Sequence, residues 1–307
     1  MDQRTPRLPQ SLRVRVAAAA IGSLVAVTVA VVLAQWLRRI PAIHVFIAAY
    51  PGVIGHDQGT PIGTPPWLAW QHFLNTLFLV LIVRTGLQLH SKKRPPSFWT
   101  RDNTRWPRTA RPPRRLSIYL WCHLWVDALW IMNGIIYIVL LVITGQWRVL
   151  VPTDWSVVPH AVSVALQYAS LDWPLENAWV GYNALQQILY TTVVFIAAPL
   201  AILTGLRLSP AWPTGGWLAR PLSERMARAI HYPVLLFFIG FTIVHVGLVL
   251  TTGMFRNLNQ MYAARESADA VGFIVCAIAV AVLAVAWVVT KPGLLKRIAA
   301  TTGKVQG

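Results

Sequence analysis

Arg228-Ala-Ile-His-Tyr-Pro-Val-Leu-Leu-Phe-Phe-Ile-Gly-Phe-Thr-Ile-Val-His-Val-Gly247 is a long apolar run that contains two histidines, His231 and His245. The fourteen residues between them correspond to a rise of about 21 Å along a helix, and fourteen steps of about 100° return the second ring to nearly the same face as the first. Because the hydrocarbon core of a bilayer is about 30 Å thick, one helix would place an imidazole near each side of a membrane.

The composition indicates a membrane protein. Of the 307 residues, 56% are hydrophobic and 12% are charged, and the mean hydropathy of +0.53 is too apolar for an ordinary soluble domain. The formal charge of +17 does not indicate nucleic-acid binding, because Lys and Arg cluster between the apolar runs and not along one amphipathic face. Cys122 and Cys276 lie far apart inside apolar runs, which argues against iron–sulfur clusters, covalently attached haem and a disulfide framework.

Six apolar runs have the length of a transmembrane helix, so we expect an all-α integral membrane protein. The first run also has the features of a secretory signal, but it is long and no A-x-A-like cleavage site clearly follows it. The runs cover residues 16–36, 67–89, 117–143, 182–206, 229–250 and 271–290.

The basic residues predict the orientation of these spans. With the N-terminus inside, the inner segments carry 21 of the 27 Lys and Arg residues, the outer segments carry 5, and Arg84 lies within the second run. The positive-inside rule then places both termini in the cytoplasm, as an even number of spans requires.

This topology limits which histidines can meet. His72 and His245 fall near the outer face, and His123 and His231 fall near the inner face. Neutral imidazole is a good ligand for haem iron, so each pair could hold one six-coordinate haem b between two helices. One buried histidine is as often structural as functional, but four that pair by depth favour a cofactor role.

His90 is an alternative to His72, because it lies eighteen residues later on the same helix face. It falls at the inner end, where two histidines already pair, and choosing it would leave His245 alone. We therefore prefer His72. The remaining histidines fall in outer connections, where they are expected to be solvated or interfacial: His44, His56 and His160.

Several other residues near the inner face are candidates. Arg84 and Asp127 reach the same depth, and they either form an ion pair between the second and third spans or serve a cofactor directly. In the second case Arg84 neutralises a haem propionate, and Asp127 orients an imidazole or relays protons to a quinone. Arg228 and Arg115, at inner helix ends, are propionate partners or simple topology charges. Four glycines allow close approach of a macrocycle or of another helix: those of Thr85-Gly86, Asn133-Gly134, Thr144-Gly145 and Thr204-Gly205.

Several stretches carry a family resemblance. They are Trp70-Gln-His-Phe-Leu-Asn with Arg84-Thr-Gly-Leu-Gln, Trp121-Cys-His-Leu-Trp with Asn133-Gly, Gly145-Gln-Trp-Arg-Val-Leu-Val-Pro-Thr-Asp-Trp, Tyr182-Asn-Ala-Leu-Gln-Gln with Leu203-Thr-Gly-Leu, and Arg228-Ala-Ile-His through Val244-His-Val. Together they resemble the bacterial di-haem cytochrome b561 family, which includes the cytochrome b subunits of formate dehydrogenase, nickel–iron hydrogenase and thiosulfate reductase. The cytochrome b/b6-domain proteins that accompany molybdopterin oxidoreductases of sulfite-oxidase type are the most similar.

The resemblance implies a four-helix di-haem core within the six transmembrane helices, with the same two histidine pairs as haem ligands. It divides the chain into an extra transmembrane helix and outer connection (1–66), the di-haem cytochrome b core (67–256), and a C-terminal transmembrane helix with a basic tail (257–307). The extra first span would invert the core relative to the formate dehydrogenase subunit.

The implied function is that of a membrane anchor in a respiratory chain of the bacterial inner membrane. Two haem b groups would carry electrons between a quinone, either menaquinone or ubiquinone, and a docked molybdopterin-type oxidoreductase subunit, and the chain itself shows no candidate catalytic residue. One alternative is a stand-alone superoxide:quinone or ferric reductase. The other is a haem-free transporter that uses Arg84 and Asp127 as substrate charges.

Overall fold

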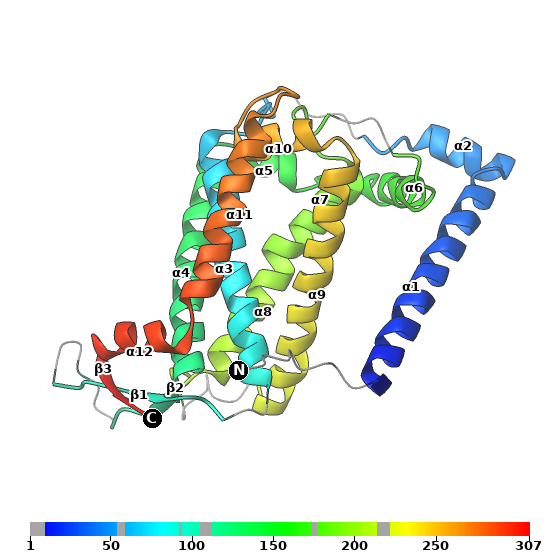
Figure 1. Cartoon of the computed structure of the whole chain (residues 1–307). Coiled ribbons are helices and arrows are strands. Elements are labelled where there is room, and N and C mark those ends of the chain that lie inside the picture. The colour runs from blue at the N-terminus through cyan, green and yellow to red at the C-terminus, as the bar shows by residue number, and fades with distance from the viewer. Residues whose placement is uncertain are drawn as a thin grey trace. The chain divides into compact units, whose positions relative to one another are not determined.

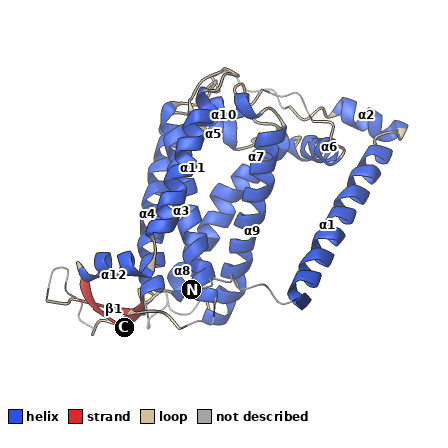
Figure 2. Ribbon diagram, viewed as in Figure 1, coloured by secondary structure: helices blue, strands red, loops and turns tan. Residues whose placement is uncertain are grey.

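The computed structural model describes residues 10–53, 59–91, 94–104, 108, 112–173, 177–213 and 222–307. Helices dominate it (Figure 2). Among the described residues, six helices are long and apolar enough to cross a membrane, which confirms the predicted multi-pass arrangement. His56 lies outside the described ranges, and so do seven of the basic residues counted above: Arg4, Arg7, Lys92, Lys93, Arg105, Arg111 and Arg220.

Each span begins and ends within six residues of its predicted run, and Figure 1 labels the spans. They are α1 (Gln10–Leu37), α3 (Pro66–His90), α4 (Ile118–Ile143), the composite α7 (Ala184–Thr192), π-helical turn (Val193–Ala197) and α8 (Ala198–Leu208), then α9 (Glu224–Thr251) and α11 (Val271–Val289). Shorter elements lie between and after them: α2 (Pro41–Ala49), β1 (Phe98–Arg101), β2 (Arg115–Ser117), α5 (Trp147–Leu150), α6 (Val157–Ala169), α10 (Met254–Tyr262), α12 (Pro292–Ala300) and β3 (Gly303–Gln306).

Two compact units make up the chain: residues 1–57, 151–177 and 182–189 form the first, and residues 58–150, 178–181 and 190–307 form the second. In the first unit, α6 packs against α1 and α2, and its core contains Val157, Ala161 and Ala184. Nδ1 of His160, predicted to be solvated or interfacial, accepts a hydrogen bond of 3.0 Å from the backbone N–H of Gly52.

The C-terminus of α6 has an unusual cap. Asp172 N–H donates to the carbonyl of Gln167, and Leu171 N–H donates to the carbonyl of Tyr168, which is the pattern of a Schellman motif. The residue at the left-handed position of this motif is usually glycine, but here it is Leu171, with a φ of 59°. A side chain at this position costs about 1–2 kcal/mol.

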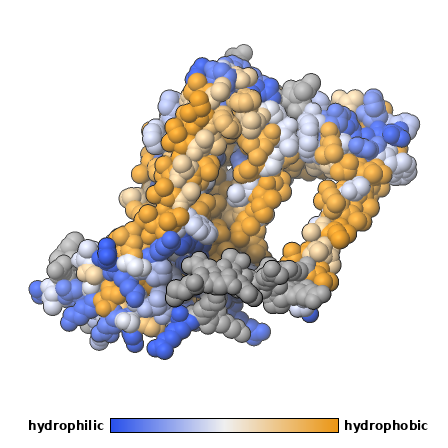
Figure 3. Space-filling view, viewed as in Figure 1, coloured by the Kyte–Doolittle hydropathy of each residue, from blue (hydrophilic) through white to orange (hydrophobic). Residues whose placement is uncertain are grey.

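In the second unit, α3 packs closely along α4, α8 packs along α9, and α11 lies against α3. Ser117 caps α4 by accepting from the N–H of Leu120, and Ser223 caps α9 by accepting from the N–H of Met226. The second cap explains why α9 begins at Glu224, five residues before the predicted run. Figure 3 shows apolar residues along the flanks of the long helices and hydrophilic residues near their ends, as lipid contact requires.

A three-stranded sheet in the order β2-β1-β3 adds to the expected all-α fold. β1 pairs antiparallel with both neighbours, with Trp99 opposite Leu116 of β2 and Val305 of β3. Trp99 Nε1 also donates a hydrogen bond of 3.0 Å to the carbonyl of Ala299 in α12. The sheet therefore ties the chain before α4 to the end of the chain.

The helix α10 is locked to the start of α11. Asn259 is fully buried, donates to the carbonyls of Phe255 and Asp269, and accepts from the N–H of Gly272 at 3.0 Å. A Cβ atom at Gly272 would overlap the backbone of Leu258 and Asn259. Only glycine therefore permits this close packing.

We expect Gly272→Ala to destabilise the protein by about 1–3 kcal/mol, because backbone atoms cannot move aside as a flexible side chain can. Thermal unfolding of the purified chain in detergent measures the effect. Gly293→Ala in α12 is the matched control, since no atom lies within 4 Å of the added methyl group. Equal stability of the two variants would show that the α10–α11 packing is loose.

Candidate functional site

The predicted partners His72, on α3, and His245, on α9, lie close together. Their ring centres are 6.3 Å apart, with 55° between the ring planes. A bond from an imidazole nitrogen to a first-row metal is about 2 Å long, and an imidazole ring has a radius of roughly 1.1 Å by its bond lengths. One metal ion between the two rings would therefore separate their centres by about 6 Å, which agrees with the observed distance.

Aromatic rings surround this pair. Phe241 stacks on His245 at 5.6 Å, Tyr190 meets His245 edge-on at 6.0 Å, and Tyr262 meets His72 edge-on at 5.5 Å. The Nδ1 atom of His72 is buried and has no hydrogen-bond partner among the described residues. A buried polar atom left in this way costs about 1–3 kcal/mol, so the site fits an additional group that binds the ring.

Tyr262 ends α10 and covers the His72 ring. Burial, followed by the neighbouring Cys276 thiol to which the phenol is hydrogen-bonded, raises the pKa of Tyr262 to about 12. The phenol that meets His72 is therefore neutral at physiological pH.

His123, on α4, is held by a threonine of α3. The Thr85 hydroxyl oxygen lies 2.8 Å from Nδ1 of His123 and 2.8 Å from the carbonyl oxygen of Leu81. A hydroxyl has one hydrogen, and that of Thr85 is donated to the carbonyl. Its oxygen therefore accepts from Nδ1–H, which leaves Nε2 of His123 as the nitrogen that can bind a metal.

His231, on α9, has the same arrangement with α8. The Thr204 hydroxyl oxygen lies 2.9 Å from Nδ1 of His231 and donates to the carbonyl of Leu200. Thr85 and Thr204 are each only 1% exposed, so water does not compete for these bonds. Both histidines are thus oriented through Nδ1 and present Nε2.

Glycines give these two rings their space. A Cβ atom at Gly86 would lie 3.7 Å from Cε1 of His123 and 3.9 Å from Leu235, one turn after His231 on α9. A Cβ atom at Gly205 would lie 3.3 Å from Cε1 of His231. Gly86 therefore lies between the His123 ring and the part of α9 that follows His231 by one turn.

Asp127 lies beside Nε2 of His123 and not beside Arg84. Its Oδ2 is 3.5 Å from Nε2 of His123, longer than a usual hydrogen bond. An unprotonated Nε2 and a carboxylate repel each other, because both carry lone pairs. A positive group near both atoms would remove this repulsion. A proton on Nε2, giving an imidazolium–carboxylate pair, or a metal ion bound to Nε2 would supply that positive charge.

The two arginines of the predicted site are directed elsewhere. Arg84 donates to the hydroxyl of Thr290, the C-cap residue of α11, and lies 4.7 Å from the ring centre of Trp287 in α11. Arg228 is 71% exposed and lies 3.7 Å from Glu224, one turn earlier on α9. The alternative ligand His90 stacks on Tyr232 at 4.6 Å.

A cavity of about 310 Å³, here called the arginine cavity, lies where α8 ends and α9 begins. Arg207 reaches it from α8, three residues after Thr204, and lies 3.5 Å from Glu224. Trp212 Nε1 is buried without a hydrogen-bond partner among the described residues. The wall also includes Arg114, nine residues before His123 in the sequence.

Two features of this site were not predicted from the sequence: the threonine hydroxyls and the arginine cavity. The Thr-Gly pairs were visible in the sequence, but only their glycines suggested a role. Among the described residues, no three or more His, Cys, Asp and Glu side chains cluster as a metal site. A haem bound by two histidines needs only two protein ligands, so its site would not form a cluster of three or more such side chains.

We expect Thr204→Val to destabilise the protein by about 1 kcal/mol, because it removes the hydroxyl that accepts from Nδ1–H of His231 inside the membrane. Thr204→Ser keeps the hydroxyl, so it should retain most of the stability that Thr204→Val loses. Thr28→Val is the matched control, since Thr28 makes the same bond to the carbonyl four residues earlier but contacts no histidine. Detergent unfolding curves in which all three variants coincide would contradict the assigned hydrogen bond.

Comparison with protein-family models, with curated proteins and with solved structures finds no match for this chain. The arrangement of histidines, threonines and glycines described above rests on the residues and distances of this chain alone.

Proposed function

We propose that this chain is a di-haem cytochrome b that carries electrons across a bacterial cytoplasmic membrane. The observation that carries the proposal is the apposition of His72 and His245 at the distance that one bound metal ion requires. The second pair, His123 and His231, supports it, because hydroxyls hold both rings by Nδ1, so that Nε2 is the nitrogen left to bind a metal.

The protein's own residues would bind the two haems, orient the histidine ligands and shield the haems from water. Each proposed haem is held between the α3–α4 pair and the α8–α9 pair, with α9 contributing one ligand to each. Haem iron supplies one-electron transfer when bound. The apolar helices exclude water, and Phe241, Tyr190 and Tyr262 surround the His72–His245 pair. Fourteen residues along α9 separate the two levels by about 21 Å, so the pair of haems would span much of the bilayer.

The electron donor and acceptor are inferred from the resemblance noted above. We propose that a quinone exchanges electrons with one haem, and that a docked oxidoreductase subunit, of the molybdopterin-dependent type, exchanges them with the other. Both termini would lie in the cytoplasm, as the distribution of basic residues predicts.

The arginine cavity is the strongest candidate for the propionates of the haem between His123 and His231. Its arginines come from the segments next to both ligands, and the buried Trp212 N–H offers a further donor. Carboxylates bind most strongly to such charged donors. Arg84 is less suited, because its guanidinium faces Trp287 of α11.

The ligand assignment predicts the haem content of histidine variants. Replacing His245 or His231 by Ala should each reduce two haem b per chain to one, because one ligand of a single haem is lost. His90→Ala, the matched control, should retain both. A pyridine haemochrome count on the purified proteins measures this. Loss of haem from His90→Ala, with both retained in His245→Ala, would assign the ligand to His90 instead.

The propionate assignment predicts a change of redox potential. Arg207→Gln should lower the midpoint potential of one haem by on the order of 50 mV, because removing a nearby positive charge favours the ferric state. Arg228→Gln should have a smaller effect, since water screens its exposed side chain. Arg265→Gln, which removes the partner of Asp269 at the other end of α9 and α11, is the control. Identical titration curves for Arg207→Gln and the control would exclude the arginine cavity.

A further inference from the structure

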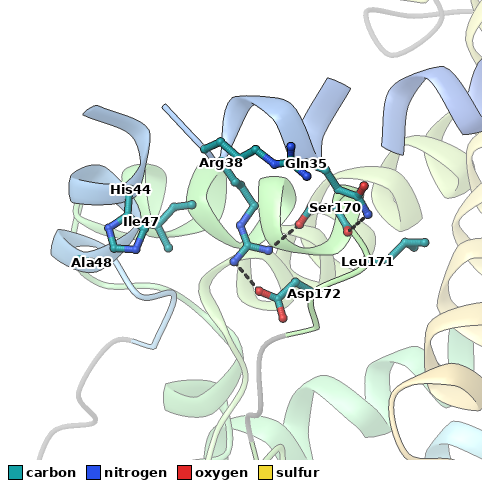
Figure 4. Close-up of a pocket in the computed structure, with 9 residues that line it drawn as sticks. Gln35, Arg38, His44, Ile47, Ala48, Ser170, Leu171 and Asp172 are labelled. Atoms are coloured by element: carbon teal, nitrogen blue, oxygen red, sulfur yellow. Dashed lines mark hydrogen bonds and ion pairs between the residues drawn. The ribbon is translucent and has the colours of Figure 1, made fainter. Parts of the chain in front are cut away.

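A cavity with a volume of about 690 Å³ lies within the first unit. We name it the α1–α2 cavity. Figure 4 shows its side chains, which come from the end of α1, from α2 and from the turn after α6. The residues that line it are Gln35, Arg38, Arg39, His44, Ile47, Ala48, Ser170, Leu171 and Asp172.

Positive charge dominates this cavity. Arg38 and Arg39 outnumber the one lining carboxylate, Asp172, and His44 adds a further donor. An anion is therefore favoured over a cation or a neutral molecule.

One of the arginines is already oriented. Arg38 pairs with Asp172 and donates a hydrogen bond of 2.8 Å to the Ser170 hydroxyl (Figure 4). The Gln35 amide donates to the carbonyl of the same serine at 3.2 Å. A guanidinium has five N–H donors in a fixed plane, so fixing it in this way leaves further donors in a defined direction. Arg39 makes no recorded polar contact within the described residues and is exposed.

The position of the cavity restricts the kind of anion. Arg38 directly follows the apolar span Val14–Leu37, so the cavity lies at the level of lipid headgroups. Ile47 and Ala48 give it an apolar side, and α2 is an apolar helix with no buried residue. An occupant with an anionic head and an apolar body matches both walls.

Leu171 adds an independent observation. It occupies the left-handed cap position where glycine is favoured, and its side chain forms part of the cavity wall. Strained residues of this kind persist where the side chain is needed. We propose that the α1–α2 cavity binds an anionic phospholipid, with its phosphate on Arg38 and Arg39 and its acyl chains beside Leu171 and α2.

The test is a lipid titration of the delipidated full-length protein in neutral detergent, with bound lipid counted by native mass spectrometry. Phosphatidylglycerol should bind at a saturable site, and Arg39→Gln should weaken this binding about ten-fold, the effect of losing one charge-assisted contact. Arg15→Gln, at the other end of α1, is the matched control and should not change it.

Leu171→Gly separates a binding role from a structural one. It should raise or preserve the unfolding temperature, because it relieves the cap, and yet weaken phosphatidylglycerol binding several-fold. Unchanged binding by this variant would overturn the role of Leu171. Equal binding of phosphatidylcholine, or equal weakening by Arg39→Gln and Arg15→Gln, would overturn the anionic lipid site. Displacement of the lipid by inorganic phosphate at millimolar concentration would assign the cavity to a free anion. The outcome does not depend on haem.

Discussion

The rest of this structure depends on the hydrogen bonds that the few polar side chains inside the membrane form with one another and with the helix backbones. Little water is available there, so a buried donor or acceptor without a partner within the protein is costly. Thr85 and Thr204 avoid this cost in the same way: each hydroxyl donates to its own helix backbone and accepts from a histidine of the neighbouring helix. That single constraint fixes the proton of each ring on Nδ1.

This constraint links packing to chemistry. α3 holds His123 of α4, and α8 holds His231 of α9, so each closely packed helix pair orients one histidine ring. The glycine after each threonine lets the imidazole approach the neighbouring helix. The His72–His245 pair, by contrast, is surrounded by aromatic rings. Under the proposed function the two haems would therefore have different surroundings, and different potentials would follow from that difference.

The helices beyond these four act as supports. Arg84 of α3 contacts Trp287 of α11 and the Thr290 hydroxyl at the end of that helix, so this intramembrane charge has a structural role. α10 packs against α3, α9 and α11, and Asn259 fixes it to the start of α11. A rigid element thus covers the His72 end of the site.

The sequence predicted the six spans well, because hydropathy over about 20 residues directly reflects transfer into a bilayer. The apposition of His72 and His245 also agrees with the depth argument, which needs only helical rise and topology. The roles of Thr85 and Thr204 could not be predicted, since most threonines in such helices bond only to their own backbone, as Thr28 does. The sheet was missed because β3 lies about 200 residues from β1. The side-chain direction of Arg84 depends on α11, whose packing the sequence does not reveal.

The most direct test of the central claim is the reduced-minus-oxidised absorption spectrum of the purified wild-type chain, with its haem content measured as the pyridine haemochrome. Two haem b per chain are predicted, one for each histidine pair. A colourless chain, purified from cells whose haem supply has been verified, would contradict the account.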